Sequence, residues 1–127
     1  MDLSATTMIH VPAEVVYGYV SDPANDVNWR TGVTESGLTT DPPLALGSEG
    51  YVKAGNQVAR WKVTAITPGD SVDWELTEGP YAGSGGYRLE DVDGNTRFTH
   101  VANVEPRGLL PASRTALRPN GPKAEPG

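Results

Sequence analysis

His100 and Tyr87 are the two side chains in this sequence best suited to proton chemistry. An imidazole titrates near neutral pH, and a phenol is able to donate a hydrogen bond to an oxygen that gains charge. His100 is in register with the apolar residues Phe98 and Ala102, two positions to either side, so it is predicted to point to the apolar face of a strand. Tyr87 and Leu89 follow the same pattern in the preceding strand. Two interpretations of His100 stay open: a general acid–base, or a buried histidine satisfied by a neighbouring hydroxyl group.

The sequence gives little support for a metal or cofactor site. It contains no cysteine and two histidines. His10 lies between Ile9 and Val11, which are predicted to face inward, so His10 is predicted to face away from His100. We therefore expect no metal site and no cofactor. The acidic residues Asp22, Asp26, Glu75 and Glu90 are interpreted as solvated charges.

Aromatic residues and one arginine are candidates for contacting a ligand. Flat side chains with a polar edge suit a ring-containing small molecule, although packing in an ordinary core is the alternative, above all for Trp74. An arginine is able to neutralise an acidic or phenolate group. The candidates for ligand contact are Tyr51, Arg60, Trp74, Tyr81, Leu89 and Phe98.

The elements that position these side chains are predicted to form an α+β fold. A strand over 3–11 leads to a helix that begins at Pro12 and ends near Ser21, and a short helix follows from Pro23 to about Trp29. Turn residues then separate successive strands, which favours an antiparallel meander over alternating βαβ units. The strands are predicted at 33–40, 47–53, 57–67, 71–78, 82–91 and 96–104.

The character of the chain changes near its C-terminus. Residues 106–127 hold five prolines. Because proline interrupts helices, we expect only a short helix after Pro111, followed by a disordered tail. The predicted organisation is one domain over 1–108, then a short helix and proline-rich tail over 109–127.

Composition narrows the classes of partner and location. The length of 127 residues is typical of one domain. The net charge of −6 disfavours a nucleic-acid partner, because binding to phosphates depends on clustered Lys and Arg side chains. No stretch approaches the roughly 20 apolar residues of a membrane span, and the first residues lack the pattern of a signal peptide. The lack of cysteine suits a reducing compartment, so a cytoplasmic location is expected.

Five motifs occur in an order typical of one superfamily. They are residues 9–17 (IHVPAEVVY), 20–29 (VSDPANDVNW), 46–48 (LGS), 79–80 (GP) and 93–100 (DGNTRFTH). Over about residues 5–108 the chain resembles the SRPBCC or START-like helix-grip superfamily. This superfamily includes START lipid-transfer domains, the birch-pollen allergen group and bacterial polyketide cyclase/dehydrase-like proteins.

The resemblance implies a curved antiparallel sheet of about six to seven strands, with two short helices after the first strand. In this superfamily the sheet grips a long C-terminal helix, and the space between them holds a ligand. Pro111 and the tail stand where most of that helix is expected, so we predict a shortened or missing C-terminal helix. An uncovered apolar face would favour a homodimer that covers the open cavity.

The resemblance also implies the function. The leading hypothesis is binding of a hydrophobic, aromatic or polyketide-like small molecule in the cavity. The alternative is a polyketide cyclase/dehydratase-type enzyme, in which His100 and Tyr87 promote enolisation or loss of water. A third class, an interaction module with a regulatory partner, is supported only by the open face and by the C-terminal segment 106–127, which holds four basic residues and one acidic residue.

Overall fold

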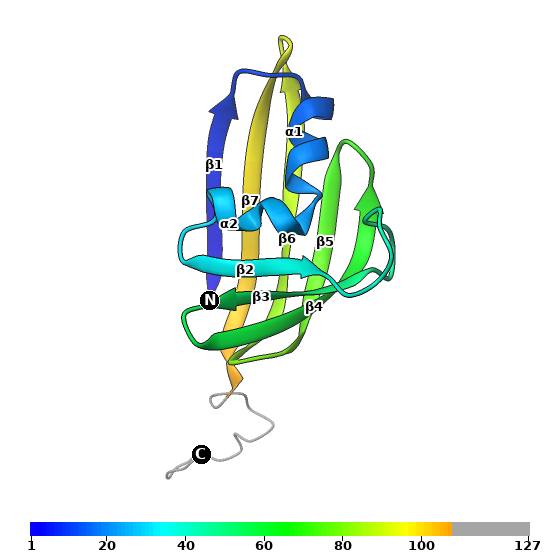
Figure 1. Ribbon diagram of the computed structural model, residues 1–127. Helices are drawn as coiled ribbons and strands as arrows, with labels where there is room; N and C mark the ends of the chain where they lie inside the picture. The colour runs from blue at the N-terminus through cyan, green and yellow to red at the C-terminus, as the bar shows by residue number, and fades with distance from the viewer. Residues whose placement is uncertain (108–127) are drawn as a thin grey trace.

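One antiparallel sheet of seven strands forms the frame of the fold in the computed structural model, which describes residues 1–107. The order of the strands in the sheet is β1-β7-β6-β5-β4-β3-β2. The strands are β1 (Asp2–Ile9), β2 (Val33–Leu38), β3 (Glu49–Ala54), β4 (Gln57–Thr67), β5 (Ser71–Glu78), β6 (Tyr81–Val92) and β7 (Asn95–Pro106). In Figure 1, β2 and β3 run almost across the direction of β1 and β7, so the sheet is strongly curved.

Short helices follow β1 and lie over one face of the sheet (Figure 1). Helix α1 (Ala13–Val20) begins after Pro12, whose missing N–H costs nothing at a helix start, and Val16 and Val20 are its buried residues. The 3₁₀ turn η1 (Pro23–Asn25) is capped by the Asp22 carboxylate, and α2 (Asp26–Trp29) follows directly.

The first and last strands pair with each other at one side of the sheet, where β1 is the edge strand. β1 pairs with β7 from Asp2 opposite Asn103 to Ile9 opposite Thr96. Thr96 is fully buried, and its hydroxyl donates a hydrogen bond to the Val11 carbonyl at 2.8 Å. This contact fixes the point at which the chain leaves β1 and turns toward α1.

The core lies between the concave face of the sheet and α1. Side chains from β4, β5, β6 and β7 alternate between this face and the opposite one, so each strand contributes every second residue. The buried apolar residues are Val16, Val20, Trp61, Val63, Val72, Tyr87, Leu89 and Phe98.

The predicted α+β class and curved antiparallel sheet are confirmed. The strand predicted at 33–40 ends at Leu38, and the second predicted helix is split into η1 and α2. The predicted short helix and tail over 109–127, and with them the shortened C-terminal helix, lie outside the described residues.

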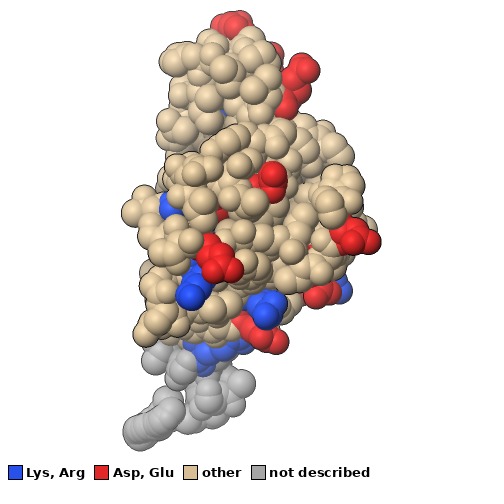
Figure 2. Space-filling model, in the orientation of Figure 1, with Lys and Arg blue, Asp and Glu red and all other residues tan. Residues whose placement is uncertain are grey.

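The described surface carries mixed charge. On the face that Figure 2 shows, acidic and basic side chains are interspersed, without a broad basic area. Among the described residues, no helix is long and apolar enough to cross a membrane. The cytoplasmic location and the lack of a nucleic-acid partner stay predictions from composition.

Candidate functional site

A cavity of about 540 Å³ lies between β1, β7 and the two helices. Its volume falls within the range of about 300–1,000 Å³ that is typical of small-molecule sites. From β1, Ala5 and Thr7 reach it because they pair with His100 and Phe98 of β7, which line it too. α1 contributes mostly apolar residues, and α2 contributes Trp29. We call this space the large cavity.

Five rings contact one another beside the large cavity, and three of them, Trp29, Phe98 and His100, line it. The Tyr87 ring lies at the centre of the group, with centroid distances of 4.7 Å to Trp74, 5.1 Å to His100 and 5.3 Å to Phe98. Trp29 adds a contact with Tyr87 at 5.6 Å. Edge-to-face and tilted contacts of this kind hold rings in fixed orientations, so the positions of His100 and Tyr87 are set by packing.

His100 is partly buried among these rings. Burial is the main reason that its pKa is lowered from 6.5 to about 4, and the positive charge of Arg30 acts in the same direction. The imidazole is therefore neutral at physiological pH, with one nitrogen free to donate and one to accept a hydrogen bond.

Tyr87 is buried, with 4% of its surface exposed. Burial raises the pKa of its phenol, and a nearby Asp26 carboxylate adds to this, while the charge of Arg30 and a hydrogen bond with it oppose the shift. Burial dominates, so the phenol keeps its proton and remains able to donate a hydrogen bond.

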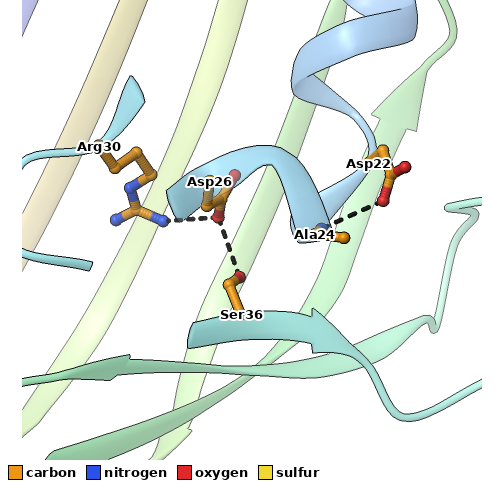
Figure 3. Close-up of polar contacts among 5 residues, drawn as sticks. All are labelled: Asp22, Ala24, Asp26, Arg30 and Ser36. Atoms are coloured by element: carbon orange, nitrogen blue, oxygen red, sulfur yellow. Dashed lines mark hydrogen bonds and ion pairs between the residues drawn. The ribbon is translucent and has the colours of Figure 1, made fainter. Parts of the chain in front are cut away.

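A second space, the small cavity of about 60 Å³, lies beside Tyr87 and Trp74. Asp26 and Arg30 give this mostly apolar cavity a polar end. Asp26 Oδ2 accepts hydrogen bonds from Arg30 Nη1 at 3.2 Å and from Ser36 Oγ at 3.3 Å (Figure 3). Burial raises the pKa of Asp26, against the opposing effect of Arg30.

Residues 1–122 match the sequence profile of a family described as polyketide cyclase / dehydrase and lipid transport. This match spans nearly the whole chain. The protein belongs to this family. The superfamily resemblance predicted from the motifs is thereby confirmed. No curated protein matches the sequence.

Solved structures share the fold of this cyclase/dehydrase family member at low sequence identity. A START superfamily protein from Mycobacterium smegmatis is 14% identical, with a TM-score of 0.73 over 90% of this chain and 83% of that one. The Zhui aromatase/cyclase from Streptomyces sp. R1128 is 12% identical, with a TM-score of 0.73 over 89% and 72%. A Deinococcus radiodurans protein, DR_A0006, is 18% identical, with a TM-score of 0.66 over 84% and 83%. The predicted START-like, helix-grip fold is confirmed.

The structure brings four of the predicted site residues of this family member together. His100 and Phe98 line the large cavity, and Tyr87 and Trp74 line the small one. Leu89 is buried in the core next to them but lines neither cavity. The two residues predicted for proton chemistry therefore touch each other across the boundary between the cavities.

Three other predicted residues lie away from both cavities. Val52 and Trp61 line the small cavity, so their neighbours Tyr51 and Arg60 point to the opposite face of the sheet. There the Tyr51 hydroxyl donates to Glu35 at 2.6 Å, and Arg60 forms an ion pair with Glu78 at 3.6 Å. Tyr81, at the start of β6, is 41% exposed. Contacts of these three with a ligand stay predictions.

The polar end of the small cavity was not found by sequence reasoning. The interpretation of Asp26 as a solvated charge is wrong, because α2 holds it against Arg30 and Ser36 with 4% of its surface exposed. The spacing of Asp26 and Arg30, four residues apart, was the available signal for an ion pair on one helix face.

The described part of the chain contains no preformed metal site. Within residues 1–107, no group of three or more His, Asp or Glu side chains is arranged to hold an ion. His10 is exposed, whereas His100 lines the large cavity. The absence of a metal or cofactor from the working protein stays a prediction.

Proposed function

We propose that this protein binds a hydrophobic, ring-containing small molecule in the large cavity. The observation that carries the proposal is the cavity itself, a volume of about 540 Å³ with a mostly apolar wall. Membership of a family described by polyketide cyclisation and lipid transport supports a guest of this chemistry. A guest of this size buries enough apolar surface to bind without any charged contact.

The electrostatics of the site favour a neutral guest. His100 is uncharged at physiological pH, and Arg30 is paired with the Asp26 carboxylate. Within residues 1–107, no net positive charge is therefore presented to the cavity to hold a carboxylate or a phenolate. The rings of Trp29 and Phe98 instead offer flat surfaces for an aromatic guest.

Titration with N-phenyl-1-naphthylamine, a fluorescent apolar probe, tests this proposal. Ala5 lines the large cavity opposite His100, so Ala5→Phe fills the space and should weaken binding by about tenfold or more. Ser4 is its neighbour on the other face of β1, and Ser4→Phe is the matched control that should bind as the wild type does. Equal binding by both variants, or no binding by the wild type, would contradict the proposal.

A second candidate function, enolisation of a bound ketone, is favoured by one observation. The His100 and Tyr87 rings lie 5.1 Å apart, and both are uncharged at neutral pH. A neutral imidazole is able to accept a proton from carbon while a phenol donates a hydrogen bond to the carbonyl oxygen. The low pKa of His100 makes it a weak base, so we rank this candidate second.

Proton exchange in heavy water distinguishes the two candidates. A cyclase-type site should accelerate the exchange of the α-protons of 2-tetralone, followed by NMR, and His100→Ala should abolish this acceleration while the ketone still binds. His10→Ala is the control, because His10 is exposed. If the wild type binds 2-tetralone but exchanges these protons no faster than buffer, the protein does not catalyse its enolisation.

We also propose that the chain forms a homodimer, in which a second copy pairs with β1 beside the open cavity. β1 is an end strand of the sheet in the described residues, and its segment 3–9 holds no charge and no proline. Such an edge pairs readily with another strand, and two copies of β1 in antiparallel orientation complement each other. Leu3 on this strand is 52% exposed, which gives the pairing an apolar contact.

Sedimentation velocity over micromolar concentrations tests the homodimer. The wild type should sediment as a dimer, and Leu3→Lys should sediment as a monomer, because a lysine on an edge strand disfavours pairing. Leu46→Lys is the control, since Leu46 is also exposed but lies in the loop before β3. A wild type that stays monomeric throughout would exclude this assembly.

A further inference from the structure

Two buried polar side-chain atoms make no hydrogen bond within the described part of the chain. They are Asp26 Oδ1, an acceptor, and Trp29 Nε1, a donor. Native proteins hold few such atoms, because a buried polar group without a partner loses its hydrogen bonds to water and gains none in return. One missing group that both accepts and donates would satisfy the pair.

Both atoms belong to α2, which contributes a residue to each of the two cavities. Asp26 lines the small cavity and Trp29 lines the large one, while Val20 of α1 lines both. Residues three apart on a helix lie on the same face, so Asp26 and Trp29 are neighbours on α2. A ligand in the large cavity therefore reaches this helix with one end.

The rest of the Asp26 carboxylate is already fixed. Its other oxygen, Oδ2, accepts from Arg30 and Ser36, as the dashed lines of Figure 3 show. These two donors hold the carboxylate in one orientation and leave Oδ1 as its free acceptor. Because the charges of Asp26 and Arg30 balance, the site favours a neutral partner over an anion or a cation.

A hydroxyl group meets these requirements. It donates one hydrogen bond and accepts others, it carries no charge, and it is small. The small cavity, at about 60 Å³, has room for it, since a water molecule in the liquid takes up about 30 Å³.

We propose that Asp26 and Trp29 form a hydroxyl-recognition site. Oδ1 of Asp26 accepts a hydrogen bond from a phenolic or alcoholic hydroxyl of the ligand, and the indole N–H of Trp29 donates one to the same oxygen. The inference rests on the proposed function, because the apolar body of that ligand lies in the large cavity. It adds the chemical class of the ligand: a neutral ring compound with a hydroxyl group at one end.

Displacement of N-phenyl-1-naphthylamine by two matched compounds tests this site. 2-Naphthol carries the hydroxyl, and 2-methoxynaphthalene has the same rings but no hydrogen to donate. The wild type should bind 2-naphthol about tenfold more tightly, as expected for a hydrogen bond to a charged acceptor. In Asp26→Asn, the new amide oxygen stays with the donors Arg30 and Ser36, so its NH₂ group replaces the acceptor Oδ1. The preference for 2-naphthol should then disappear.

Two further variants complete the test. Trp29→Phe keeps an aromatic ring but removes the donor, and should weaken the binding of 2-naphthol by about threefold. It also serves if Asp26→Asn does not fold. Asp22→Asn is the control, because Asp22 caps η1 outside both cavities and asparagine caps equally well.

The outcomes separate this inference from the proposed function. Equal binding of the two compounds by the wild type, or an unchanged preference in Asp26→Asn together with unchanged 2-naphthol affinity in Trp29→Phe, would overturn the hydroxyl site alone. Failure of both compounds to bind the wild type would overturn the proposed function and this site with it.

Discussion

The burial of His100 beside the large cavity makes the stability of the fold depend on pH. Its imidazole lies 5.1 Å from the Tyr87 ring, 5.9 Å from Trp74 and 6.2 Å from Trp29, measured between centroids. Water is largely replaced by rings around it, so the charged form is disfavoured and the neutral form is kept. The apolar surroundings that favour a neutral ligand also disfavour protonated His100, so acid is expected to destabilise the folded protein.

The free energy of unfolding should therefore fall as the solution is acidified. The unfolded chain takes up a proton on His100 near its ordinary pKa of 6.5, whereas the folded protein resists until about 4, so stability is lost as pH falls through this window. Allowing for its partial exposure, we expect this residue to account for about 1–2 kcal/mol between about pH 7 and about pH 5.

Urea unfolding at the two pH values checks this prediction. His100→Gln should lose less stability on acidification than the wild type, and His10→Gln, a change at an exposed histidine, should behave as the wild type does. A His100→Gln variant with the full wild-type pH dependence would show that other groups cause it.

At the residue level, the sequence predicts the direction of strand side chains well. The two-residue spacing from Phe98 placed His100 on the inner face, and the structure puts it there. Asp26 shows the limit of this reasoning. Its burial depends on α2 packing against Ser36 of β2, and no local pattern in a four-residue helix reveals such a contact.

At the level of elements, the pairing of β5 with β6 positions the ring cluster. Trp74 lies opposite Gly85 across the two strands. A Cβ atom at Gly85 would stand 2.9 Å from the indole Nε1 of Trp74, which is closer than packed side chains allow. Glycine here lets the indole lie flat over the neighbouring strand and reach the Tyr87 ring.

Gly85→Ala should therefore displace Trp74 and destabilise the protein by about 1–3 kcal/mol, as is usual for overpacking. Gly18→Ala is the matched control in α1, where an added Cβ meets nothing within 4 Å and alanine favours the helix, so stability should be unchanged or higher. Thermal unfolding by circular dichroism measures both. Equal stability of the two variants would contradict the close contact between Gly85 and Trp74.

Most elements could be predicted from sequence because their signals are local. The hairpin between β6 and β7, for example, turns at Asp93 and Gly94, both of which have positive φ, and the pair Asp-Gly is a common signal for such turns. The pairing of β1 with β7 joins residues that lie far apart in the chain. The alternation of apolar and polar residues along a strand does not show which distant strand it pairs with. The arrangement of the whole sheet was therefore predicted only from the family resemblance.

For the whole molecule, the central feature is the space left between a curved sheet and two short helices. Its volume depends on how far α1 stands from β1 and β7, and that distance is set by the chain path through Pro12 and the contact of Thr96 with Val11. Sequence patterns predicted an apolar concave face. They did not predict which part of it is filled by side chains and which part is empty.

Chemical-shift mapping by NMR with N-phenyl-1-naphthylamine shows whether an apolar ligand binds in the large cavity. The amide signals that move on titration should cluster at Ala5, Val16, Trp29 and His100, around the large cavity. Tyr51 and Arg60, on the opposite face, should not move. Shifts confined to that opposite face, or no shifts at saturating probe, would contradict the claim that the large cavity is the binding site.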